Sequence, residues 1–192
     1  GDGGTGKAGS TRHDPNLPRE IKRTCVKLTG KLGSGQFGDV SKGVLDEKLQ
    51  SLPGGVLVAV KSATSVTSEG AEEICREAAI MAQLTEHQNV LSLIGVVTKG
   101  EPLLLLLSFC EHGSLLSLLR WPRASTAPSP LRDKTFFSIA LDIANGMKHL
   151  SSSFVVHRDL AARNVLVDSL LVCKVADFGL SRGLSHLKSK EG

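Results

Sequence analysis

Three glycines placed close together, Gly33, Gly35 and Gly38, interrupt a stretch that otherwise favours β-strands. Apolar residues alternate from Cys25 toward the first glycine, and residues 39–44 (DVSKGV) follow the last one with poor helix-forming character. We therefore expect the glycine loop to join two strands of a sheet. Because glycine has no Cβ atom, such a loop lets its backbone approach an anionic group closely. A hairpin without a ligand is the alternative that this feature alone leaves open.

The residues after this loop argue against a dinucleotide-binding oxidoreductase, which uses the same glycine spacing. In that fold the glycines open a helix, and an acidic residue follows about 20 positions later. Here a strand is expected after the loop, and position 58 is valine. An earlier segment, GDGGTGK, has the glycine and lysine spacing of a phosphate-binding P-loop, but Ala8 replaces the hydroxyl residue that would hold Mg²⁺. We interpret residues 1–24 as a flexible leader.

The composition excludes several classes of protein. A length of 192 residues is typical of one globular domain, and a net charge of +4 with 4% aromatic residues predicts no nucleic-acid partner. The longest apolar run, residues 103–107, is far shorter than the roughly 20 residues that span a bilayer, so we expect no membrane contact within this segment. The cysteines form no C-x-x-C pair, which argues against a zinc site. We expect all four to be small buried residues in a reducing, cytoplasmic compartment: Cys25, Cys75, Cys110 and Cys173.

The chain divides into two parts of different character. We expect the first to be a sheet with one helix, at residues 69–84, and the second to be mostly helical. The long helix of the second part is expected over residues 131–152, with Ser129 as its N-cap and Pro130 in its first turn. Apolar runs predict further strands at residues 56–61, 90–97 and 102–109 and shorter extended pieces at 154–156, 165–167 and 171–175.

A glutamate occupies a position where the helix pattern calls for an apolar residue. Glu77 lies between Ile74 and Met81 on the apolar face of the predicted helix. An unpaired buried carboxylate is costly, and Lys61, at the end of the strand 56–61, is the available cation. Paired in this way, the ammonium group would lie near the glycine loop, where it could meet phosphate oxygens. A surface position for Glu77 and a snorkelling Lys61 are the alternatives that either residue alone leaves open.

A polar segment, residues 157–164 (HRDLAARN), lies between two apolar runs. Asp159 and Asn164 supply a carboxylate base and an amide oxygen, and Asp177 supplies a second carboxylate farther along the chain. A few oxygen ligands suit Mg²⁺ when substrate phosphates and water complete its coordination. A solvated loop accounts for any one of these residues, but it does not account for all of them in this order.

In this order the motifs resemble the signature set of the protein kinases, over about residues 25–182. The form HRDLAARN, in place of the HRDLKxxN of serine/threonine kinases, is similar to the tyrosine kinases. Leu17-Pro18-Arg19-Glu20 and the long loop 46–55 look receptor-like, which would make the chain a cytoplasmic part of a single-pass plasma-membrane receptor. The matching motifs are Gly33-x-Gly35-x-x-Gly38-x-Val40, Val58-Ala59-Val60-Lys61, Glu77, His157-Arg158-Asp159 through Asn164, and Asp177-Phe178-Gly179.

The resemblance implies an α+β fold of two lobes. Residues 25–110 would form the smaller lobe and the hinge, with an antiparallel sheet and one helix. Residues 111–192 would form a partial, mostly helical larger lobe that contains the catalytic loop and the start of the activation loop. Leu107 would be the gatekeeper of the adenine pocket. The implied ATP-binding residues are Leu32, Gly33, Ser34, Gly35, Gly38, Val40, Ala59, Lys61, Cys110 and Leu166.

The resemblance also implies catalytic and metal-binding roles. Lys61, held by Glu77, would grip the α- and β-phosphates of ATP, and Asn164 and Asp177 would hold Mg²⁺. Asp159 would accept the proton of the substrate hydroxyl as the γ-phosphate is transferred. Arg163 would help to place a tyrosine of a protein substrate.

The chain also departs from the family pattern in several ways that bear on its predicted kinase activity. Ten residues follow Arg182, so we expect the A-P-E segment and the substrate-docking remainder of the larger lobe to be missing, and any dimerisation to use those missing regions. Ser108 stands where tyrosine kinases usually carry an acidic hinge residue, and the stretch contains no tyrosine. A truncated or pseudokinase-like fragment that binds ATP and regulates without turnover is therefore the alternative hypothesis.

Overall fold

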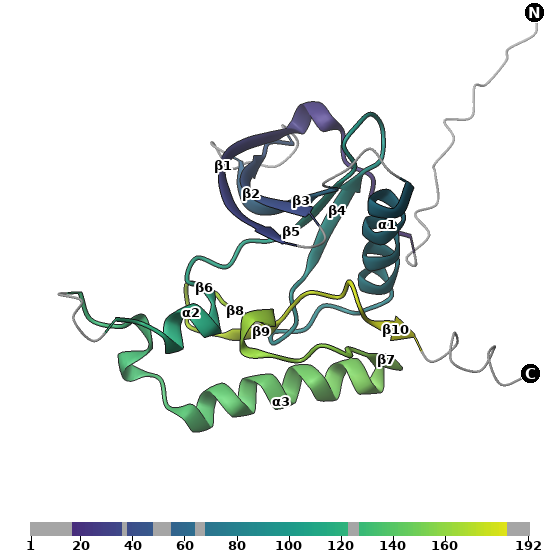
Figure 1. The fold of residues 1–192 in the computed structure, drawn as a ribbon. Helices are drawn as coiled ribbons and strands as arrows, with labels where there is room; N and C mark the ends of the chain where they lie inside the picture. The colour runs from purple at the N-terminus through teal and green to yellow at the C-terminus, as the bar shows by residue number, and fades with distance from the viewer. Residues whose placement is uncertain (1–16, 36–37, 48–54, 64–67, 123–126, 184–192) are drawn as a thin grey trace, which may run out of the picture.

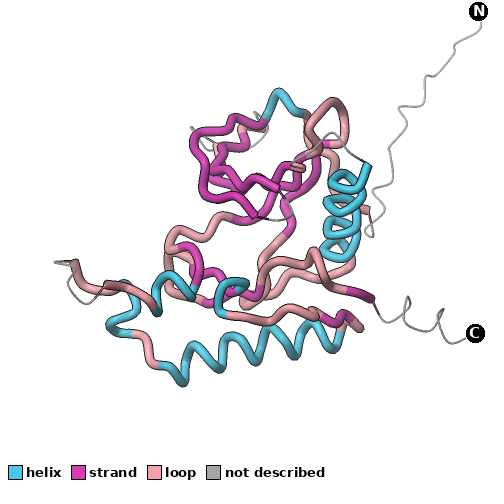
Figure 2. Tube along the Cα trace, viewed as in Figure 1, coloured by secondary structure: helices cyan, strands magenta, loops and turns pink. Residues whose placement is uncertain are grey.

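The computed structural model describes residues 17–35, 38–47, 55–63, 68–122 and 127–183 (Figure 1). A strand-rich part with one long helix lies above a part that contains the second long helix in this view, and loops connect the two (Figures 1 and 2). The predicted α+β class with a two-lobe arrangement is confirmed. The P-loop-like segment within residues 1–7 lies outside the described residues.

Five antiparallel strands form the sheet of the smaller lobe, in the order β1-β2-β3-β5-β4. The first two pair from Val26 opposite Leu45 to Gly35 opposite Gly38, so the glycine loop joins two strands, as predicted. The strands are β1 (Val26–Gly35), β2 (Gly38–Leu45), β3 (Val56–Ser62), β4 (Leu93–Val97) and β5 (Leu104–Ser108).

Both faces of the central strands are buried, which explains the unbroken apolar run of β5. Successive side chains of a strand point to opposite faces. Leu105 and Leu107 pack in one core with residues of the helix α1 (Ser68–Ala82), whereas Leu104 and Leu106 pack in a second core with Ile21. The helix therefore covers only one face of the sheet, as Figure 1 shows.

The structure differs from the predicted flexible leader at residues 17–24. The N–H of Ile21 donates to the carbonyl of Val96 at 2.7 Å, and the N–H of Val96 donates to the carbonyl of Arg19 at 2.8 Å. Ile21 is 1% exposed, and a Cβ atom on Gly95 would lie 2.6 Å from its Cδ1. Residues 19–21 thus pair with β4. The buried Ile21 anchors this part of the predicted leader, which is otherwise polar and rich in glycine and proline.

The larger lobe contains the second long helix, α3, and several short elements. The helix α3 begins later than predicted, because its N-cap is Thr135, whose side chain accepts the N–H of Ser138. Ser129 instead caps the preceding 3-10 turn, where its side chain accepts the N–H of Leu131. None of the helices in the described ranges is both long and apolar enough to cross a bilayer. The elements are η1 (Arg23–Cys25) in the smaller lobe and β6 (Gly113–Ser114), α2 (Leu115–Leu119), η2 (Pro130–Asp133), α3 (Phe136–Ser152), β7 (Val155–Val156), η3 (Ala162–Asn164), β8 (Val165–Val167), β9 (Cys173–Val175) and β10 (Arg182–Gly183) in the larger one.

The four cysteines are all free thiols but lie in different environments. Cys110 and Cys173 are buried, Cys25 is partly buried, and Cys75 is exposed on α1. The expectation of four buried cysteines is therefore wrong for Cys75, because this residue lies next to the buried Ile74 on the outer side of the helix.

Candidate active site

A cleft of about 250 Å³ lies between the sheet and the larger lobe. Its apolar surface comes from both lobes, with Val40 and Ala59 on adjacent strands of the sheet, Leu107 at the end of β5, and Leu166 on β8. Its polar surface brings together residues that the sequence assigned to phosphate, metal and catalysis: Lys61, Glu77, Arg163, Asn164 and Asp177.

Two residues of the glycine motif, Gly38 and Val40, line the cleft. Leu32, Gly33 and Ser34, which the resemblance assigned to ATP, are not among its described lining residues, and their contact with ATP stays a prediction. The tip at residues 36–37 lies outside the described residues. Gly38 has a φ of 136°, a backbone conformation that favours glycine, so the third glycine of the motif is required by the turn itself.

Lys61 and Glu77 form a buried ion pair. Nζ of Lys61, on β3, lies 2.6 Å from Oε2 of Glu77, on α1, and the two side chains are 10% and 2% exposed. The other carboxylate oxygen of Glu77, Oε1, accepts the backbone N–H of Phe178 at 3.3 Å. Nζ of Lys61 also lies 3.9 Å from Oδ1 of Asp177. The surface alternatives for Glu77 and Lys61 are therefore excluded, and the ammonium group lies at the cleft.

A second set of polar contacts organises the segment 157–164. Asn164 uses its side-chain Nδ2 group to donate to both the carbonyl oxygen and the Oδ2 atom of Asp159, each at 2.8 Å. Arg163 donates to Oδ1 of the same carboxylate at 2.6 Å. His157 is buried, and its Nε2 lies 2.9 Å from the carbonyl of Ala176. The segment is thus tied to the residue that precedes Asp177.

Asp177 is held at the cleft by its backbone and by a buried neighbour. Its φ of 64° is uncommon for a non-glycine residue. Phe178, the next residue, is fully buried and packs edge-on against the ring of His157, with 5.4 Å between ring centroids. The N–H of Gly179 lies 3.4 Å from Oδ1 of Asp177. Burial of Phe178 on one side therefore fixes where the carboxylate projects.

The residues predicted to hold a metal fit that role by their chemistry. Both Nδ2 bonds of Asn164 go to Asp159, so Oδ1 is the atom that Asn164 can offer a cation. Asp177 lines the same cleft and offers carboxylate oxygens. No cluster of three or more His, Cys, Asp or Glu side chains suited to a metal occurs in the part of the chain that the structure describes. Two oxygen donors match Mg²⁺ held jointly by protein, phosphates and water.

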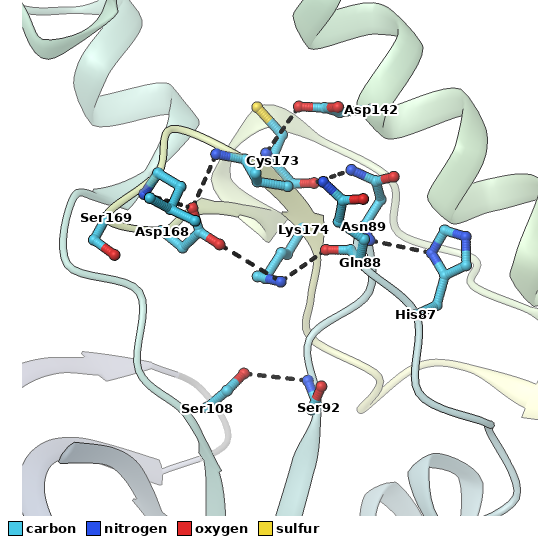
Figure 3. A network of polar contacts seen from close by, with 12 residues as sticks. His87, Gln88, Asn89, Ser92, Ser108, Asp142, Asp168, Ser169, Cys173 and Lys174 are labelled. Atoms are coloured by element: carbon cyan, nitrogen blue, oxygen red, sulfur yellow. Dashed lines mark hydrogen bonds and ion pairs between the residues drawn. The ribbon is translucent and has the colours of Figure 1, made fainter. Parts of the chain in front are cut away.

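The connection between the lobes follows β5. Oγ of Ser108 accepts the N–H of Ser92 at 3.2 Å (Figure 3). The N–H of Ser108 in turn donates to the carbonyl of Ser92. Cys110 is not a lining residue of the cleft, and its carbonyl accepts the N–H of Gly113 at 3.2 Å. Burial raises the pKa of its thiol to about 12, so this group is a poor nucleophile at neutral pH.

Leu91 and Ala176 also line the cleft, although no motif in the sequence points to either residue. Each directly follows one residue of a parallel bridge, between Val90 and Val175, that residue patterns do not reveal. The only available signal was position, because Ala176 directly precedes Asp177.

Comparison with known proteins gives a consistent result. The family described as protein tyrosine and serine/threonine kinase matches residues 26–192. Ephrin type-B receptor 3 of Xenopus laevis is 41% identical over 190 residues, which cover 93% of this chain and 18% of that receptor. Ephrin type-B receptor 2 of Gallus gallus and Ephrin type-B receptor 3 of Homo sapiens are each 43% identical over 187 residues, which cover 91% of this chain and 17% of each receptor. The chain therefore spans less than a fifth of the length of these relatives.

Proposed function

The chain belongs to the protein tyrosine and serine/threonine kinase family, and on this basis we propose that it transfers the γ-phosphate of ATP to a tyrosine hydroxyl of a protein substrate. One observation carries the proposal: a single cleft contains Lys61, which is paired with Glu77, together with Asp177 and Asn164. The three receptors similar to this chain at 41–43% identity support a receptor-type kinase, whose kinase part would lie in the cytoplasm.

The apolar part of the cleft would bind the adenine ring of ATP, and the cationic part would bind its phosphates. Val40, Ala59 and Leu166 offer apolar surface from both lobes for the adenine ring. Lys61 presents its ammonium group where phosphate oxygens would lie, and Glu77 fixes that group by a 2.6 Å ion pair. Mg²⁺, bound by oxygens of Asn164 and Asp177, would neutralise charge on the phosphates.

Asp159 is the candidate base. Arg163 and Asn164 both donate to its carboxylate, and these two bonds orient the two oxygens. An ionised carboxylate in this place would accept the proton of a substrate hydroxyl as phosphate is transferred. The AAR sequence that carries Arg163 supports tyrosine as the acceptor.

The test compares two peptides that differ only in the acceptor, tyrosine or serine, with the full-length protein and magnesium–ATP. We expect phosphate on the tyrosine peptide, and a loss of about 10²–10⁴-fold for Asp159→Asn because a general base is removed. Asp133→Asn is the matched control, since the Asp133 side chain is 83% exposed on η2. Transfer to the serine peptide alone would contradict tyrosine specificity. Nucleotide binding without any transfer would instead favour the regulatory, pseudokinase-like alternative.

A further inference from the structure

Two histidines from different parts of the chain stack against each other. His87 lies in the connection between α1 and β4, and His149 lies in the last turns of α3. Their ring centroids are 4.6 Å apart and the ring planes are inclined by 16°. Nε2 of His149 lies 3.0 Å from the carbonyl oxygen of Thr85, so the ring donates to that carbonyl. This stack joins the connection after α1 to the larger lobe.

The hydrogen bonds require His87 to be neutral. Its Nδ1 accepts the backbone N–H of Asn89 at 3.1 Å, as Figure 3 shows. A protonated imidazole carries a hydrogen on both nitrogens and accepts no hydrogen bond. Protonation of His87 would therefore break its bond with Asn89, and a second proton on His149 would add repulsion between the stacked rings.

The surroundings of His87 oppose its protonation. Burial lowers its pKa most, followed by the nearby His149 on α3 and Lys174 on β9. Glu86, the exposed neighbour in the chain, and Arg19, from the segment before β1, line the same cavity as His87. Because the pKa of His87 is lower in the folded chain than its ordinary value of 6.5, the unfolded chain takes up more protons as the pH falls. The stabilising contribution is complete above about pH 6.5 and is lost as the pH falls toward the lowered pKa.

The residues after His87 hold β9. The carbonyl of Asn89 accepts the N–H of Val175 at 2.9 Å, and the carbonyl of Val175 accepts the N–H of Leu91 at 2.9 Å. Nδ2 of Asn89 donates to the carbonyl of Cys173 at 3.1 Å, and Nζ of Lys174 donates to the carbonyl of Gln88 at 2.7 Å (Figure 3). Every residue of β9 is thus bonded to the segment 87–91.

The contact between the segment 87–91 and β9 lies two residues before Asp177, which lines the cleft. Val175 is followed by Ala176, whose N–H donates to the carbonyl of Asn164 at 2.8 Å, and then by Asp177. The same short stretch therefore connects the histidine stack to both candidate metal ligands.

We propose that His87 is a positioning residue whose neutral form, stacked on His149, holds the segment 87–91 against β9 and so places Asp177, and that proton uptake releases this contact. The second half, the effect on magnesium–nucleotide binding, rests on the proposed function. The device would make the site sensitive to mild acid through a residue that does not line the cleft.

The first test measures the contact itself, without nucleotide or transfer. Amide hydrogen exchange is followed by NMR at pH 7.5 and pH 5.5 for the N–H groups of Leu91 and Val175, together with the titration of each imidazole. After correction for their intrinsic exchange rates, we expect both amides to lose protection in acid. The midpoint of this loss should coincide with the midpoint of the His87 titration. In His87→Asn the asparagine oxygen accepts the N–H two residues later and gains no proton, so protection is expected to persist in acid.

Two further variants keep this test decisive. His112→Asn is the matched control, because His112 lies outside the stack, and its profile should equal that of the wild type. His149→Phe keeps an aromatic stack but removes one proton-binding ring, so the transition should move to higher pH. If the wild-type protection of Leu91 and Val175 does not change with pH, or changes equally in His87→Asn, the proposal is overturned.

The second test measures the affinity for magnesium with a non-hydrolysable ATP analogue over the same pH range. We expect the wild type to lose affinity in acid and His87→Asn to lose less. Equal losses in the two proteins would overturn the positioning of Asp177. Absence of nucleotide binding at every pH, with the exchange result intact, would contradict the proposed function and support the histidine contact.

Discussion

Gly146 offers a sharp test of how closely α3 packs against the segment 87–91. The residue is buried in the middle of the helix, and a Cβ atom there would lie 2.4 Å from the carbonyl oxygen of Asn89 and 2.9 Å from Cγ2 of Val175. The helix itself favours Gly146→Ala, because alanine is about 0.5–1 kcal/mol better than glycine inside a helix. The sign of the total effect therefore depends on the contact with Asn89.

The structure predicts that the contact outweighs helix propensity. The obstacle is a backbone carbonyl that already accepts the N–H of Val175 at 2.9 Å, so it has little freedom to move. Overpacking of this kind costs roughly 1–3 kcal/mol, and a weakened hydrogen bond costs about 1 kcal/mol more. We expect Gly146→Ala to lower the free energy of unfolding by about 2 kcal/mol, the difference between these losses and the gain in helix propensity.

Urea and thermal unfolding measure this effect. For a chain of this size a loss of 2 kcal/mol corresponds to a fall in Tm of roughly 4–8 °C. Asn145→Ala is the matched control, because Asn145 is the exposed neighbour on the same helix and should be neutral or slightly stabilised. If Gly146→Ala is as stable as the wild type or more stable, the close packing of α3 on Asn89 is refuted.

Three other predictions follow from the contacts described above. Glu77→Gln leaves the buried Lys61 ammonium without its main counter-charge and should lower the free energy of unfolding by about 3 kcal/mol and weaken nucleotide binding; unchanged unfolding in urea would contradict the buried pair. Burial raises the pKa of Cys110 to about 12, so iodoacetamide at pH 8 should label the exposed Cys75 first, as followed by mass spectrometry; early labelling of Cys110 would oppose this assignment. Thr135→Ala removes the N-cap of α3 and should cost about 1 kcal/mol in thermal unfolding, whereas Thr135→Ser should restore most of it.

Much of the candidate site could be predicted because its residues break local patterns. Glu77 is a charge on an apolar helical stripe, and such a residue requires a buried partner, which the structure identifies as Lys61. The polar segment 157–164 between apolar runs likewise stands out. Each feature is visible within a few residues of sequence, so no knowledge of distant contacts was needed.

The parts that could not be predicted depend on contacts between distant residues. The pairing of Val90 with Val175 is a single bridge with no periodicity of its own. Ser129 and Thr135 both suit an N-cap, and each caps a different helix, so sequence alone does not distinguish which of them begins α3. Ile21 is one apolar residue in a polar window, and its burial depends on the space beside Gly95.

Glu77 links three segments through one carboxylate. Oε2 belongs to the pair with Lys61 on β3, and Oε1 accepts the N–H of Phe178. An outward rotation of α1 would take the Glu77 carboxylate away from the buried Lys61 ammonium and from the buried N–H of Phe178 in the same step. A partly opened form would therefore carry the free-energy cost of both lost contacts at once. We therefore expect partly opened forms to be sparsely populated, so that the cleft opens and closes cooperatively.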